Sequence, residues 1–161
     1  MSLDRFHQAQ ANPSAGYETA LKEIRGGAKQ SHWIWYILPQ IEGLGRSSTA
    51  RAYALRSLDE AGAYLKDPIL GTRYEEIVGA VAEQLACGRS VEALMGGSTD
   101  AMKLASSLTL FHAASRRLGA GDGSFAALAA RWDSLLQKMA EQGYPPCEFT
   151  RHHCGDGSPG A

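Results

Sequence analysis

The sequence predicts an all-α fold, a compact single domain of about seven or eight short helices. A chain of 161 residues is long enough for one domain with its own hydrophobic core. It holds 25 alanines against nine valines and isoleucines together, and alanine favours helices whereas β-branched residues favour strands. Its 18 glycines suit the turns between helices. This composition argues against a sandwich, a barrel or a large parallel sheet.

Apolar residues at helical spacing, followed by a breaking residue, predict the first two helices. Ser2 is placed to cap a short helix over 3–10, which Pro13 interrupts. A second helix over 17–24 is expected to stop at Gly26.

The segment over 31–40, with the sequence SHWIWYILPQ, is the most unusual in the chain. Ser31 can cap one or two helical turns here, and Pro39 prevents a simple continuation. A buried strand would give the same apolar run, so both interpretations stay open.

Capping signals mark the later helices. Ser57 followed by Glu60 matches a capping box, and Asp67 before Pro68 indicates the cap and first position of another helix. In order, the remaining helices are expected over 49–56, 57–66, 68–87, 90–95, 98–118 and 124–139.

One helical domain is expected over 1–146, followed by a flexible tail over 147–161. The tail contains Cys147, His152 and Cys154, whose side chains suit zinc, but their spacing matches no common structural site. We therefore expect no metal and no cofactor.

Charge and cysteine content exclude several classes of function. The chain has 16 basic and 17 acidic residues, so it lacks the basic excess of proteins that bind nucleic acid or anionic membranes. The longest apolar run, over 33–38, is far shorter than a membrane helix, and the N-terminus is charged where a signal peptide is apolar. Three cysteines are too few for a disulfide framework. These features predict a cytoplasmic monomer or weak homo-oligomer.

Three large aromatic residues, Trp33, Trp35 and Tyr36, lie within four positions. In a helix, Trp35 and Tyr36 share one side with His32, while Trp33 faces another. One interpretation is a core element whose indole N–H groups bond to carbonyls. The other is an aromatic wall that stacks a planar ligand, with His32 and Gln40 as polar contacts.

Two glycine-rich turns, over 43–49 and 96–100, lead into expected helix starts. Unpaired N–H groups at a helix start suit phosphate or carboxylate. The first turn also contains Arg46, a forked donor for phosphate, and Ser47. Ordinary turn and cap chemistry explains the same residues.

The helix expected over 98–118 is rich in polar residues. Lys103 and Ser107 share a face, with Ser106 beside them, and a Ser–Lys pair can supply a nucleophile and a base. Small residues on a helix equally permit close packing against a neighbour. The spacing of His112 supports no Ser–His–Asp arrangement.

The chain resembles a bacterial family labelled domain of unknown function 1810, sometimes mislabelled calpastatin. The resemblance is carried by Asp4-Arg5-Phe6-x-x-Ala9-Gln10, Tyr17 with Ala20-Leu21, the block over 31–40, Gly43-Leu44-Gly45-Arg46-Ser47, Leu58-Asp59-Glu60-Ala61-x-x-Tyr64-Leu65, Pro68-x-Leu70-Gly71-x-Arg73, and Asp100-x-Met102-Lys103-Leu104-x-Ser106-Ser107-Leu108-Thr109-Leu110-Phe111. It implies a compact multi-helical fold and no established substrate. Phe6-x-x-Ala9-Gln10 is also similar to a feature of all-helical N-glycosidases that act on ADP-ribose-type nucleotides.

We expect a protein that binds a small phosphate-bearing metabolite such as a nucleotide, with hydrolysis or N-glycosidase activity as an open question. Trp33, Trp35 or Tyr36 would stack the base, with Gln40 and Ser106 as further polar contacts, and Arg46 and Ser47 would meet the phosphate. The catalytic candidates are His32, Lys103 and Ser107. The alternative is a non-enzymatic interaction module that uses an aromatic surface patch.

Overall fold

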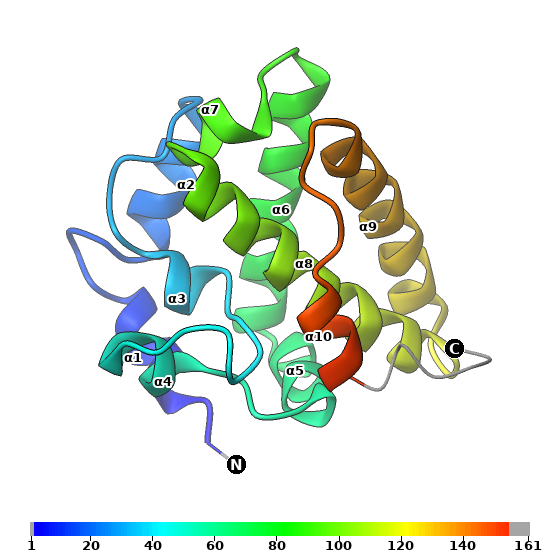
Figure 1. Ribbon diagram of the computed structural model, residues 1–161. Helices are drawn as coiled ribbons and strands as arrows, with labels where there is room; N and C mark the ends of the chain where they lie inside the picture. The colour runs from blue at the N-terminus through cyan, green and yellow to red at the C-terminus, as the bar shows by residue number, and fades with distance from the viewer. Residues whose placement is uncertain (1, 155–161) are drawn as a thin grey trace.

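Residues 2–154 are the part of the chain that the computed structural model describes, and they form ten helices (Figure 1). The helices are α1 (Asp4–Gln10), α2 (Tyr17–Arg25), α3 (Ile34–Ile37), α4 (Ser48–Tyr53), α5 (Leu58–Lys66), α6 (Leu70–Ala86), α7 (Val91–Met95), α8 (Ser98–Gly119), α9 (Gly123–Glu141) and α10 (Glu148–His153). The all-α prediction is confirmed, but the helices outnumber the seven or eight expected. The excess arises because the segment over 31–40, left open between helix and strand, contains α3, and because residues 148–153, expected to belong to the tail, form α10.

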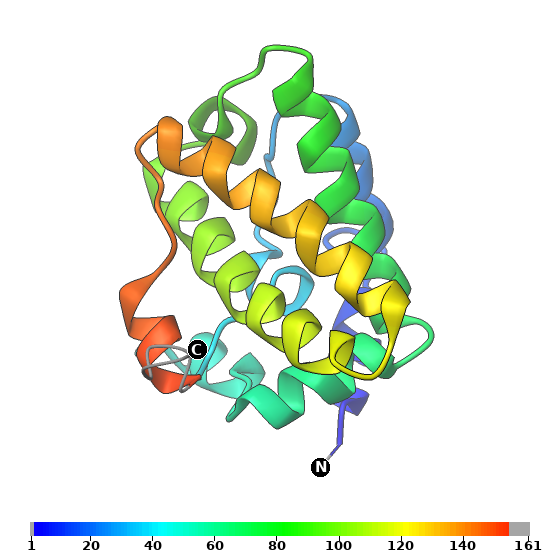
Figure 2. The same cartoon turned by 90° about the vertical axis from the view of Figure 1, so that its right-hand side faces the viewer.

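Helix α8 is the centre of the fold. Helices α5, α7, α9 and α10 pack against it, and Figure 2 shows α9 running beside it. The side chains of Leu104, Leu108 and Phe111 are fully buried. The end of α8 approaches α9 closely because residue 119 is glycine: a Cβ atom on Gly119 would lie 2.9 Å from Cα of Ala126.

Aromatic rings join four helices inside this core. Phe111 of α8 lies 4.2 Å from Tyr74 of α6 and 5.2 Å from Tyr64 of α5, measured between ring centroids. Trp132 of α9 meets Tyr74 edge-on at 5.4 Å. Such pairs contribute about 0.5–1.5 kcal/mol beyond the burial of their area.

Within residues 2–154, no helix combines the length and the apolar character needed to cross a bilayer.

A backbone bridge closes the loop that contains α4. The N–H of Leu55 donates to the carbonyl of Gln40 at 2.9 Å, and the N–H of Glu42 donates to the carbonyl of Leu55 at 2.8 Å. The bridge pairs Ile41 with Leu55 in parallel fashion. It holds the glycine-rich turn that begins at Gly43 against the rest of the fold.

The structure corrects the predicted tail, because residues 148–153 form α10 and pack on α8. Thr150 is fully buried, and the N–H of Cys147 donates to Oγ1 of Thr109 at 3.0 Å. The ring of Phe149 packs against the turn at Gly43, where a Cβ atom would lie only 2.8 Å from it. A six-residue helix is too short for periodicity to reveal. The remainder of the predicted tail, residues 155–161, lies outside the described residues.

Candidate functional site

Trp33 belongs to the core, as one of the two interpretations expected. Its side chain is 1% exposed, so it has no free face for a ligand, and its Nε1 donates to Oε1 of Glu23 at 2.9 Å. Glu23 also accepts hydrogen bonds from the backbone N–H groups of Gln30 and Ser31 and from the Ser31 hydroxyl. Burial would raise the pKa of Glu23, but these bonds outweigh it and lower the pKa to about 2.

Trp35 is half-buried and lies where three separate parts of the sequence meet. Nζ of Lys103, on α8, is 4.4 Å from the centre of the Trp35 ring. A Cβ atom on Gly45 would lie 2.8 Å from Cη2 of Trp35, so a side chain there would clash with the ring. Arg46 follows directly and is exposed. We call Trp35, Gly45, Arg46 and Lys103 the Trp35 cluster.

Asp100 links the Trp35 cluster to the buried Trp33. Its carboxylate lies 2.7 Å from Nζ of Lys29 and 3.5 Å from Nζ of Lys103. The Lys29 side chain is 5% exposed and lies over the Trp33 ring, with Nζ 4.9 Å from its centre. One carboxylate therefore faces two ammonium groups, and Lys29 is its closer partner.

Three of the predicted site residues use their polar groups inside the fold. The Gln40 amide is buried and donates to the carbonyls of Leu38 at 3.0 Å and Lys103 at 2.8 Å. The Ser106 hydroxyl donates to the carbonyl of Met102 at 3.0 Å. Ser107 is fully buried, and its hydroxyl shares a 3.0 Å hydrogen bond with the Tyr74 hydroxyl.

The considered Ser–Lys pair does not form. Ser107 faces the core, whereas Lys103 meets Asp100 and the Trp35 ring. Close packing, the other reading of the small residues on this helix, explains Ser107 because its neighbour is a buried tyrosine.

The remaining candidates lie nearer the surface. His32 is exposed, and its carbonyl is 3.3 Å from the hydroxyl of Tyr36, which also donates to the carbonyl of Ala15. Tyr36 is half-buried. The hydroxyl of Ser47 accepts the N–H of Ala50 at 3.1 Å and caps α4.

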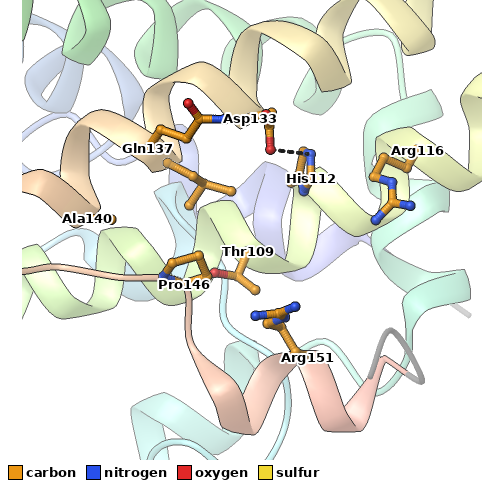
Figure 3. A pocket seen from close by; sticks show the side chains of 9 residues that line it. Thr109, His112, Arg116, Asp133, Gln137, Ala140, Pro146 and Arg151 are labelled. Atoms are coloured by element: carbon orange, nitrogen blue, oxygen red, sulfur yellow. Dashed lines mark hydrogen bonds and ion pairs between the residues drawn. The ribbon is translucent and has the colours of Figure 1, made fainter. Parts of the chain in front are cut away.

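A hollow that sequence reasoning missed lies between α8, α9 and the start of α10 (Figure 3). Its volume is about 270 Å³. We call it the His112 pocket, and its lining residues are Thr109, His112, Arg116, Asp133, Leu136, Gln137, Ala140, Pro146 and Arg151.

Charged groups from three helices face this pocket. Nε2 of His112 lies 3.8 Å from Oδ1 of Asp133, and the His112 side chain is 16% exposed. Figure 3 shows His112 and Arg116 on α8, Asp133 across from them on α9, and Arg151 on α10. Among residues 2–154, no three His, Cys, Asp or Glu side chains gather in a way that could hold a metal ion.

The signal that could have revealed the pocket is helical spacing. Thr109, His112 and Arg116 follow one face of α8, and Asp133, Gln137 and Ala140 follow one face of α9. Polar residues on one face usually indicate solvent, so the pattern alone does not show that two such faces enclose a hollow.

The architecture defines an all-helical protein with two polar regions beside its central helix. The chain belongs to the family described as protein of unknown function (DUF1810), which matches residues 1–132. It is also similar to the crystal structure of the conserved hypothetical protein Rv1873 from Mycobacterium tuberculosis, with 35% identity and a TM-score of 0.76. That similarity covers 95% of this chain and 96% of the other. No curated protein matches this chain.

Proposed function

We propose that this protein binds a small phosphate-bearing metabolite, such as a nucleotide, at the Trp35 cluster. The observation that carries this proposal is the meeting of the aromatic block, the Gly45–Arg46 turn and α8 at one half-buried ring. The thiols of Cys87 and Cys147 form no disulfide among the described residues, which supports a location in the reducing cytoplasm.

Each member of the cluster has a role that its chemistry suits. The indole of Trp35 offers a flat π-face on which a base stacks. The guanidinium of Arg46 grips phosphate through two parallel hydrogen bonds, and the ammonium of Lys103 adds a point charge. The exposed His32, three residues before Trp35, is the candidate acid or base if the bound molecule is cleaved.

The ion pairs explain how Lys103 becomes available to phosphate. Asp100 is closer to Lys29 than to Lys103, at 2.7 Å against 3.5 Å. A phosphate can therefore replace Asp100 as the partner of Lys103, while Asp100 keeps the buried Lys29 neutralised.

Isothermal titration calorimetry with AMP and ADP tests the proposal. Arg46→Ala and Trp35→Leu should each weaken binding about tenfold, because each removes a contact of roughly 1–3 kcal/mol. Arg51→Ala is the matched control, since Arg51 is an exposed arginine on the neighbouring α4. The proposal fails if neither nucleotide binds, or if Arg46→Ala and Arg51→Ala have equal effects.

The alternative function is a protein-interaction surface built around the same ring. It is favoured by Met102, which adjoins Lys103 and is 61% exposed. In this case the chain should associate in a concentration-dependent way that Met102→Lys abolishes, as measured by sedimentation, and it should bind no nucleotide.

A further inference from the structure

The side chain of Gln40 joins two parts of the Trp35 cluster. Gln40 is 3% exposed, and its Nε2 donates to the carbonyl of Lys103 at 2.8 Å and to the carbonyl of Leu38 at 3.0 Å. Lys103 belongs to α8, whereas Leu38 directly follows α3, the helix that contains Trp35. The two N–H groups of one amide therefore tie the end of α3 to α8 at the level of Lys103.

The bond to Leu38 serves a carbonyl at the end of α3. The N–H of Leu38 donates to the carbonyl of Ile34 at 2.9 Å, and the next residue is Pro39, which has no N–H group. The last carbonyls of a helix find no N–H partner within it, and a buried carbonyl without a partner is costly. The Gln40 amide supplies such a donor and thereby fixes the end of this short helix.

The backbone of Gln40 reaches the third part of the cluster. Its carbonyl accepts the N–H of Leu55 at 2.9 Å, and this bond begins the bridge that pairs Ile41 with Leu55. Because Ile41 and Leu55 are buried, the bridge is a firm base for the turn that starts at Gly43 and contains Arg46. One residue thus connects the aromatic block, α8 and the glycine-rich turn.

We propose that Gln40 is a positioning residue of the nucleotide site, which holds the three parts of the Trp35 cluster in place without touching the ligand. The inference rests on the proposed function, because it concerns how the same site is arranged. Burial leaves Gln40 almost no surface with which to contact a ligand. Groups that are already in place lose less freedom when a ligand binds, so this arrangement raises affinity.

The ring current of Trp35 gives a measurement that needs no ligand. Nζ of Lys103 lies 4.4 Å from the centre of this ring, so the methylene protons beside it should resonate upfield of those of the exposed Lys138. In Gln40→Met, which keeps the length of the side chain but has no N–H donor, this upfield shift should be largely lost. The NMR order parameter of the Arg46 amide should fall as well.

Isothermal titration calorimetry with AMP measures the consequence for binding. Gln40→Met should weaken AMP binding about three- to tenfold, because binding must then also order the cluster. Gln10→Met is the matched control: Gln10 is buried as well, and its amide donates to the Tyr36 carbonyl and the Tyr64 hydroxyl, neither of which belongs to the cluster. This control should also lower the unfolding temperature, but it should leave the Lys103 signal and the AMP affinity in place. If Gln40→Met does not fold, the smaller Gln40→Leu replaces it.

Two results would overturn the proposal. One is a Lys103 methylene signal that is the same in Gln40→Met and in the unchanged protein, and the other is an equal loss of AMP affinity in Gln40→Met and Gln10→Met. A failure of the proposed function is distinguishable from both. In that case AMP does not bind the unchanged protein, while the Lys103 signal still shows whether Gln40 arranges the cluster.

Discussion

The Trp35 cluster and the His112 pocket flank the same helix but arise from the sequence in different ways. The cluster contains part of a contiguous aromatic block and lies wholly within the residues that the family matches. The pocket joins residues of α8 to Asp133, Gln137 and Arg151, which lie beyond residue 132. An aromatic ring beside an ammonium group marks the cluster, whereas a hollow between three helices marks the pocket.

This difference shows that the large aromatic residues of one short segment can have different roles, in the core or nearer the surface. Trp33 and Trp35 are two positions apart, yet one is core and the other half-buried. Trp33 donates a hydrogen bond to Glu23 of α2 and lies beneath Lys29. Because Lys29 pairs with Asp100 of α8, these contacts tie the aromatic block to both helices. Inconspicuous polar residues such as His112 and Arg151 become a candidate site only once three helices have packed.

The largest effect should separate the two tryptophans. Trp33→Ala should lower the free energy of unfolding by about 3–5 kcal/mol because it leaves a cavity in the core. Trp35→Ala should cost clearly less, since that ring is only half-buried. Urea unfolding measures both changes, and equal losses of unfolding free energy would contradict the placing of Trp33 in the core and Trp35 nearer the surface. Trp33→Phe, which keeps a ring in the core, should retain the nucleotide affinity that Trp35→Leu loses.

An intermediate effect should distinguish the pocket from the cluster. Thr109→Val leaves the N–H of Cys147 without its partner, which costs about 1–3 kcal/mol, and it loosens the segment that carries Arg151. Thermal unfolding should show this loss, while nucleotide affinity at the Trp35 cluster stays unchanged. Ser134→Ala is the control, because that hydroxyl is exposed and bonds only within α9. A Thr109 variant that unfolded at the same temperature as the unchanged protein would show that α10 needs no such anchor.

A smaller effect should appear as a pH dependence of the aromatic block. Hydrogen bonds hold the pKa of Glu23 at about 2, against 4.5 for the ordinary side chain. The unfolded chain therefore binds more protons, so this contribution to stability is complete above about pH 4.5 and is lost as the pH falls toward 2. Glu23→Gln should flatten the dependence of urea unfolding on pH across that window. An unchanged slope would mean that the Glu23 bonds do not stabilise the fold.

Local features could be predicted from the sequence because their partners lie a few residues apart. Ser57 caps α5 as expected, with its hydroxyl accepting the N–H of Glu60 at 3.2 Å. The Glu60 carboxylate, in contrast, accepts the N–H of Arg56 at 2.8 Å, a small departure from the expected capping box. The phosphate-binding role of Arg46 stays a prediction.

Features that depend on packing between distant segments could not be predicted. Spacing placed Ser107 on the same face as Lys103, but the approach of α6 turns Ser107 toward Tyr74. Likewise, α10 is stabilised by Thr109 and Gly43, neither of which is near it in the sequence. Only the three-dimensional arrangement shows that Trp35 lies beneath Lys103.

The central claim is that a nucleotide binds at the Trp35 cluster, and the indole N–H signals in a ¹H–¹⁵N spectrum test it most directly. The three indoles are those of Trp33, Trp35 and Trp132, and only Trp35 is more than slightly exposed. AMP should shift the Trp35 signal and leave the other two in place. If AMP leaves the Trp35 signal unmoved, or shifts the signals of the buried Trp33 and Trp132 as much, the assignment of the site to Trp35 is contradicted.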